Sequence, residues 1–258
     1  MSQKSIKGTS KLGEAIKSRR QELGLTIEEA ATKAGVGIKT WCRYESGESI
    51  RSDKAKGICK ALNWRTLSNE NDSNNAEFNL EEYQNKDAWS QYLCDQFGEA
   101  VAISFAIGSD FLLDYINDDL DEIARLPKGS HLGQLSVSMM KDILPEQFLM
   151  LYDYDFLYHL KVEVLKLRRI AQSGNPIIAH TVLQELAIYL IAEESEFLME
   201  TMLPAMMSSG ISGLDALEDW PFDLFDDMDI VTWLYSNNYI TKDNIYHFDH
   251  WAEDQFYA

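Results

Sequence analysis

The chain has 258 residues, of which 45% are hydrophobic and 11% aromatic, which is enough apolar material for one large or two medium folded domains. We find no secretory leader and no run of about 18 uncharged apolar residues, so we expect a cytoplasmic protein that does not span a membrane. The formal net charge of −19 is uneven, because residues 1–66 carry 14 Lys and Arg against 7 acids, a net of +7, while the remainder carries −26. So large an asymmetry predicts different functions for the two segments, and only the first is suited to nucleic acid.

The three cysteines are Cys42, Cys59 and Cys94, an odd number with no CxxC or Cys/His ligand spacing. This pattern argues against a disulfide framework and against a zinc site.

Residues 12–64 are predicted to form five short helices joined by tight connections. The first helix ends at Gly24, and Thr26 is a good N-cap for the second. Residues 35–37 form a three-residue turn that contains two glycines, and a third helix runs over residues 38–45. A helix, a short turn with Gly and a second helix are the parts of a helix-turn-helix, whose second helix enters the major groove of DNA.

This segment resembles the Xre and Cro-like helix-turn-helix family of phage-repressor type, over roughly a quarter of the chain. The residues that carry the resemblance, in order and spacing, are Leu25, Thr26, Glu28, Glu29, Ala31, Lys33, Gly35, Val36, Thr40, Arg43, Glu45 and Gly47. The resemblance implies a lambda-repressor-like fold, double-stranded DNA as the ligand and dimers on two half-sites. It also implies a structural pair, Arg20 with Glu45, that fixes the angle of the third helix.

The third helix supplies the residues that we expect to read bases. Lys39 and Arg43 share a helix face, Thr40 lies beside them, and an arginine can bind guanine O6 and N7 as a fork. Gly37 and Ile38 belong to the same DNA-binding surface but depart from the family, which has a Ser or Thr cap and a polar residue there. Ile38 offers only packing on a thymine methyl. Phosphate contacts, which set register without reading sequence, are expected from Thr26, Ser46, the Gly47 amide and Lys54.

Four other residues near this surface need interpretation. Ile27 stands where the family commonly has a Gln that supports the third helix. We expect Trp41 and Tyr44 in the core rather than as stacking platforms for bases. Cys42 lies near basic side chains, so a redox-sensing thiol stays open as an alternative.

Residues 67–79 are rich in Asn, Ser and Asp, which predicts a linker between a DNA-binding domain of residues 1–66 and an acidic domain of residues 80–258. We expect the acidic domain to be all-helical, to dimerise and to sense a signal or bind a partner. The fold class is therefore all-α throughout.

Within the acidic domain, apolar residues recur at helical spacing from Phe156 to Leu167, and that helix is expected to stop at Gly174. Asn175 and Pro176 are expected to begin the next helix, antiparallel to the first across a tight turn. Further helices are predicted over residues 87–107, 110–124, 134–144, 228–235 and 241–256. No 34-residue repeat has a convincing register.

No enzyme signature occurs in the acidic domain. A Ser/Lys protease domain, a zinc HExxH motif and a GxxxxGK[ST] phosphate loop are all absent from the sequence, so we expect no catalysis, no cofactor and no metal. The acidic runs at 118–122, 193–196 and 223–229 are interpreted as solvated faces. His247, Asp249 and His250 are interpreted as part of a packed amphipathic helix, and residues 220–225 as either a core plug or a docking surface.

These observations favour a sequence-specific transcriptional regulator, most simply a repressor that forms a homodimer. The runner-up is an antitoxin or immunity-type protein that binds a basic partner through the acidic domain and represses its own operon. A peptide-binding regulator with a helical-repeat domain is the third hypothesis.

Overall fold

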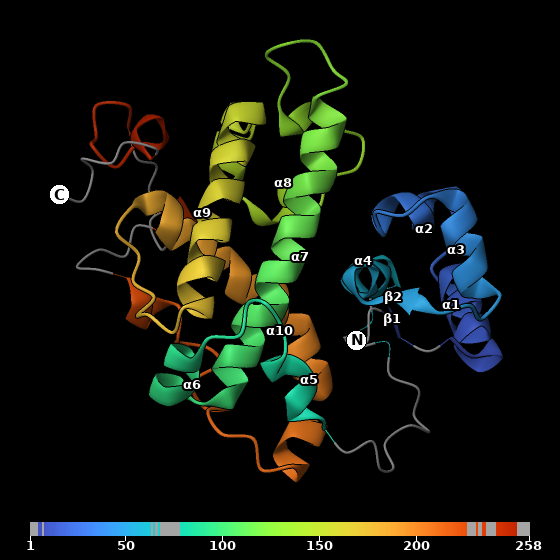
Figure 1. The fold of residues 1–258 in the computed structure, drawn as a ribbon. Coiled ribbons are helices and arrows are strands. Elements are labelled where there is room, and N and C mark those ends of the chain that lie inside the picture. Colours follow the sequence, from blue (N-terminus) through green and yellow to red (C-terminus); the bar gives the residue numbers. More distant parts are fainter. Residues whose placement is uncertain are drawn as a thin grey trace. The chain divides into compact units, whose positions relative to one another are not determined.

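The computed structural model describes residues 5–6, 8–62, 64, 67, 78–225, 231, 234–235 and 241–251. It divides into two compact units, residues 1–78 and 79–258, and both are helical (Figure 1). The expected all-α fold with an N-terminal helix-turn-helix is confirmed. Most of the expected linker lies outside the described residues.

The N-terminal unit consists of four helices and one pair of short strands among its described residues. In chain order these are β1 (Ser5–Ile6), α1 (Ser10–Glu22), α2 (Ile27–Lys33), α3 (Ile38–Glu45), β2 (Ile50–Arg51) and α4 (Ser52–Leu62). Five helices were expected. The difference arises where the chain leaves α3, because residues 50–51 run extended and pair antiparallel with β1 instead of coiling, which buries Ile50.

Local capping explains where α2 begins. The Thr26 hydroxyl accepts a hydrogen bond from the Glu29 amide (3.1 Å), and the Glu29 carboxylate accepts one from the Thr26 amide (2.7 Å). This reciprocal capping box satisfies two of the amides that a helix N-terminus leaves without intrahelical partners. Buried side chains from all four helices then form the core of the unit, among them Leu12, Ile16, Ala30, Trp41, Ile58 and Leu62.

The C-terminal unit is built around one long helix. Its α-helices are α5 (Leu80–Gln84), α6 (Gln91–Phe97), α7 (Glu99–Ile123), α8 (Met140–Ile143), α9 (Tyr154–Gln172) and α10 (Val182–Ser208). Figure 1 shows α7 running the length of the unit, and α6, α9 and α10 pack against it. Short 3₁₀ helices are found at Leu132–Gln134, Glu146–Leu151, Phe222–Leu224 and Phe248–His250.

The helix boundary expected between residues 107 and 110 is wrong, because α7 continues through it. Gly108 lies at the contact with α10, and a Cβ there would come within 1.8 Å of the Ile191 carbonyl oxygen. The glycine therefore serves close helix packing rather than a turn. The real break is at Gly98 (φ +101°), between α6 and α7, inside the stretch predicted as one helix.

The helix predicted to end at Gly174 is confirmed as α9, with Gly174 at φ +73° two residues after its end. The predicted start of the next helix at Pro176 is wrong. The segment stays extended because the Ala179 amide donates to the Leu224 carbonyl (2.8 Å), and Thr181 then caps α10 through the Gln184 amide.

Two further helix predictions also need correction. In residues 134–144 only α8 is α-helical, because the backbone is extended at Leu135. The helix begins near Ser138, whose hydroxyl accepts a hydrogen bond from the Lys141 amide in the first turn of α8. Residues 241–251 form turns and one 3₁₀ helix instead of an amphipathic α-helix, although Trp251 is buried as expected of an inward-facing residue. Most of the helix predicted at 228–235 lies outside the described residues. Among the described helices, none is long and apolar enough to cross a bilayer.

Candidate nucleic-acid interface

A nearly buried ion pair fixes α3 against the rest of the N-terminal unit. Arg20 in α1 reaches Glu45 at the end of α3 with two contacts, Nε to Oε1 at 2.5 Å and Nη2 to Oε2 at 3.2 Å. The third nitrogen of the guanidinium, Nη1, donates to the Leu25 carbonyl (2.8 Å), and the Trp41 indole donates to the Glu45 carboxylate (2.6 Å). The pairing of Arg20 with Glu45 that the sequence resemblance implied is present.

The electrostatics of Glu45 follow from these contacts. Burial by itself would raise the pKa of the Glu45 carboxyl, but hydrogen bonds from Arg20 and Trp41 outweigh burial and hold the pKa below its usual value. Because Arg20 is on α1 and Trp41 is one turn before Glu45 on α3, this carboxylate ties the orientation of α3 to the scaffold.

The opposite face of α3 is open to solvent. Ile38 is 49% exposed, Lys39 is exposed and Thr40 is half-buried, while Gly37 caps the helix without a side-chain hydrogen bond. Trp41 and Tyr44 point the other way and are buried, which agrees with the prediction that they belong to the core. The residues predicted to read bases therefore lie together on the exposed side of this helix.

Arg43 has a partner that the sequence did not reveal. Its guanidinium is bound on one edge by Glu48, with Nε to Oε2 at 2.8 Å and Nη2 to Oε2 at 2.6 Å, and both side chains are about half or more exposed. The hydrogen bond from Arg43 lowers the pKa of Glu48. A guanidinium has a second donor edge, made by its two terminal nitrogens, and that edge stays available for an acceptor pair such as guanine O6 and N7.

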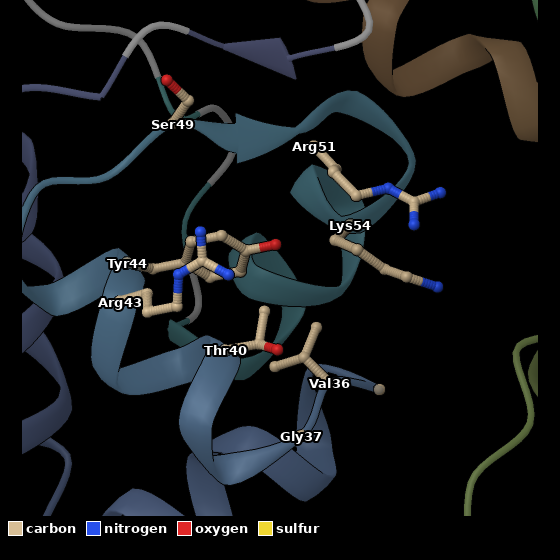
Figure 2. A pocket seen from close by; sticks show the side chains of 9 residues that line it. Val36, Gly37, Thr40, Arg43, Tyr44, Ser49, Arg51 and Lys54 are labelled. Carbon is tan, nitrogen blue, oxygen red and sulfur yellow. The ribbon is translucent and has the colours of Figure 1, made fainter.

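A hollow beside α3 is lined by three cationic side chains. It lies between the 35–37 turn, α3 and the start of α4, and Figure 2 shows Arg51 and Lys54 extending in the same direction on its wall, with Arg43 across from them. Arg51 was not among the predicted residues. Asp53, itself buried, contacts both Arg51 (2.9 Å) and Lys54 (3.5 Å), so one carboxylate holds two cations in place.

The other residues predicted to contact phosphate are already engaged within the fold. The Thr26 hydroxyl caps α2, and the Ser46 hydroxyl donates to the Arg43 carbonyl (2.8 Å). The Gly47 amide donates to the Tyr44 carbonyl (3.0 Å), so it is not a free donor in this conformation. A Cβ at Gly47 (φ +85°) would meet the Thr9 carbonyl oxygen at 2.7 Å, which gives this glycine a structural role.

The cysteines and acidic runs can also be placed. Cys42 is exposed on α3, and Cys59 is buried, which raises the pKa of its thiol to about 12. No group of three or more His, Cys, Asp or Glu side chains could hold a metal ion among the described residues. The predicted solvated faces are not wholly solvated, because Asp119 and Glu194 are buried; part of the third run lies outside the described residues.

Comparison with known proteins supports the assignment of the N-terminal unit. Residues 11–63 match a family model described as a helix-turn-helix domain. Searches of the curated proteins and of the solved structures find no match to the chain. The N-terminal unit is therefore a helix-turn-helix domain of the DNA-binding kind, and the match covers α1 to α4 but nothing of the C-terminal unit.

Proposed function

We propose that the protein is a sequence-specific transcriptional regulator, and specifically a repressor of Xre type that acts in the cytoplasm. The observation that carries this proposal is the exposed face of α3, which presents Ile38, Lys39 and Arg43 while Glu45 and Trp41 anchor its other side. A helix held rigidly with its polar face outward is what major-groove recognition requires.

The cationic side chains that line the hollow beside α3 give the proposal a second support. Arg51 and Lys54 line the hollow beside α3, and basic side chains next to a helix in the major groove are suited to contact the phosphates that flank the groove. We infer that they bind phosphates and set the register, and that Arg43 supplies the main sequence-dependent contact.

We further propose that the C-terminal unit makes the protein a homodimer. A single helix-turn-helix contacts few base pairs, and two copies on half-sites about one helical turn apart multiply the affinity. We assign no enzymatic activity to the chain.

The decisive experiment is recovery of bound genomic DNA with the full-length protein, followed by binding to the recovered sites over a series of salt concentrations. We expect one palindromic motif, whose half-site spacing gives the geometry of the dimer. The logarithm of the affinity should fall linearly with the logarithm of the salt concentration, with a slope set by the number of phosphates bound. Recovery of DNA with no shared motif would contradict sequence-specific regulation.

The charge of the C-terminal segment favours one alternative. With a net of −26 over residues 67–258, this part of the chain suits a basic protein partner, as in an antitoxin or immunity protein that also represses its own operon. Purification of the protein from its native source separates the two proposals, since the alternative requires a basic protein to co-purify in a fixed ratio.

A further inference from the structure

A cleft in the C-terminal unit combines an apolar lining with carboxylates. It has a volume of about 410 Å³ and lies between α10, the start of α7 and the segment of residues 214–222. Its apolar lining comes from Tyr189, Met199, Leu203, Leu214, Leu217 and Phe222. A volume of this size falls in the range of small-molecule sites, which are apolar with a few polar groups.

The charge of the lining has one sign. Four carboxylates line the cleft, and no Lys, Arg or His is found among the described residues that line it; the four are Glu193, Glu196, Glu200 and Glu218. Three of them follow one another on α10 at spacings of three and four residues, where like charges on a helix destabilise each other. Glu196, Glu200 and Glu218 are exposed and Glu193 is half-buried, so the cost is the repulsion among like charges, which a bound cation would offset.

Tyr189 lies beside two of these carboxylates, and its hydroxyl is hydrogen-bonded to Glu193. Burial raises the pKa of its hydroxyl to about 12, and the neighbouring charges of Glu193 and Glu196 raise it in the same direction. Deeper in the cleft, the hydroxyls of Ser104 and Ser195 are buried and lie 2.7 Å apart, so the inner end is neutral and polar.

We propose that this cleft is a binding site for a small organic cation with an apolar body, such as an aryl-alkyl amine. The ammonium group lies among the carboxylates of α10, and the apolar body packs on Met199, Leu203 and Leu217. Tyr189 and Phe222 add aromatic faces, to which cations are attracted. The proposal does not rest on DNA binding, because it concerns only the C-terminal unit.

Three probes with the same apolar body test the charge preference. We would titrate the full-length protein by calorimetry with 4-phenylbutylamine, 4-phenylbutanol and 4-phenylbutyrate. We expect the amine to bind roughly tenfold or more tightly than the alcohol, and the acid not to bind, because a charge-assisted contact exceeds a neutral one by about that much. Raising the salt concentration should weaken binding of the amine and leave the alcohol unchanged.

Variants locate the site. The double substitution Glu196→Gln with Glu200→Gln should lower the affinity for the amine about tenfold and leave that for the alcohol unchanged, which also shows that the cleft is intact. Leu203→Lys should abolish amine binding by placing a cation in the cleft. Glu146→Gln, a matched exposed glutamate outside the cleft, should change nothing. Equal affinity for amine and alcohol, or no binding of any probe, would overturn the proposal.

Discussion

Arg43 shows how one side chain can be both exposed and oriented. A long arginine on a helix surface samples many rotamers, and holding it in one of them costs conformational entropy on binding. Glu48 restrains the guanidinium before DNA arrives, with contacts of 2.8 and 2.6 Å on the edge that contains Nε. The second edge, made by the two terminal nitrogens, is then positioned for the bidentate base contact that we propose.

The first prediction concerns the base contact itself. Arg43→Ala should weaken operator binding by roughly 1 to 3 kcal/mol and remove the preference at a single base position, because one bidentate contact is lost. Binding to a panel of operators with single base changes measures both effects. If the sequence preference of the variant is unchanged, Arg43 is not the residue that reads the base.

A second prediction separates orientation from charge at Glu48. In Glu48→Gln the guanidinium of Arg43 is less firmly held and a negative charge next to the DNA backbone is removed. We therefore expect tighter binding to random DNA together with weaker discrimination at the base that Arg43 contacts. The ratio of specific to non-specific affinity at fixed salt is the measurement, and a ratio equal to that of the wild type would refute an orienting role. Glu22→Gln is a suitable control, because Glu22 pairs with Arg19 on α1.

Asp119 supplies a prediction about pH. It is buried and accepts a hydrogen bond from the Ser138 hydroxyl (2.6 Å), and burial raises the pKa of its carboxyl to about 7. Because the folded protein binds this proton more tightly than the unfolded chain, the stability contributed by Asp119 is full below about pH 4 and is lost as the pH rises through 7.

Asp119→Asn removes this titration. The variant should be more stable than the wild type at pH 8, by at most about 4 kcal/mol, and the two should converge near pH 4. Urea unfolding at several pH values measures the difference. Equal pH dependence of the two proteins would show that Asp119 does not titrate in this range.

At the scale of elements, the ion pair of Arg20 with Glu45, which we call the brace between α1 and α3, holds α3 in its orientation. Glu45 accepts two hydrogen bonds from Arg20 and one from Trp41, so its loss leaves three donor groups without an acceptor in a site that is about nine-tenths buried. Glu45→Ala should therefore destabilise the N-terminal domain by roughly 2 to 5 kcal/mol. Arg20→Met with Glu45→Leu should be milder, because it removes both charges.

The pH dependence of the brace has the opposite sign to that of Asp119. The pKa of Glu45 is lowered in the folded domain, so its stabilisation is present above the usual glutamate pKa and is lost as the pH falls through the lowered value. Urea unfolding of the chain truncated after residue 79, followed by helical circular dichroism at several pH values, measures both the substitutions and the loss of stability at low pH. Full stability of Glu45→Ala would contradict the assigned role of the brace.

Helix ends that are set by local capping residues were predictable from the sequence. Thr26, with an acid three residues later, marked the start of α2, and Gly174 marked the end of α9, because capping chemistry is local. The orientation of α3 was also accessible, since the pair Arg20 and Glu45 was implied by the resemblance. Glu48 and Arg51 were not, because their contacts depend on how the chain turns after α3.

The errors fall where long-range contacts override local propensity. Gly108 carries the signal of a helix break, yet the close approach of α10 uses it within a continuous helix. Pro176 carries the signal of a helix start, yet the contact between Ala179 and Leu224 keeps that segment extended. Neither partner is near in sequence, so no local pattern could have shown the outcome.

At the scale of the whole molecule, the two segments of opposite charge act on DNA in opposite directions. Residues 1–66 carry +7 and are attracted to DNA, while the remainder carries −26 and is repelled from it. This repulsion lowers the affinity for random DNA and for an operator alike, so only a site that adds base contacts is expected to be bound tightly. We therefore expect the acidic segment to limit occupancy of random DNA, in addition to the role in assembly that we propose.

Removal of residues 80–258 tests both roles at once. The truncated protein should bind random DNA more tightly per monomer than the full chain, because the repelling charge is gone. It should bind a palindromic operator roughly 100-fold or more weakly, since the second half-site is no longer engaged by a linked copy. Fusing a parallel two-stranded coiled coil to residue 79 should restore the affinity for the operator without restoring the weak binding of the full chain to random DNA. If the truncated protein keeps its operator affinity, the C-terminal unit does not dimerise the DNA-binding domains, and if binding to random DNA is unchanged, its charge does not reach the DNA.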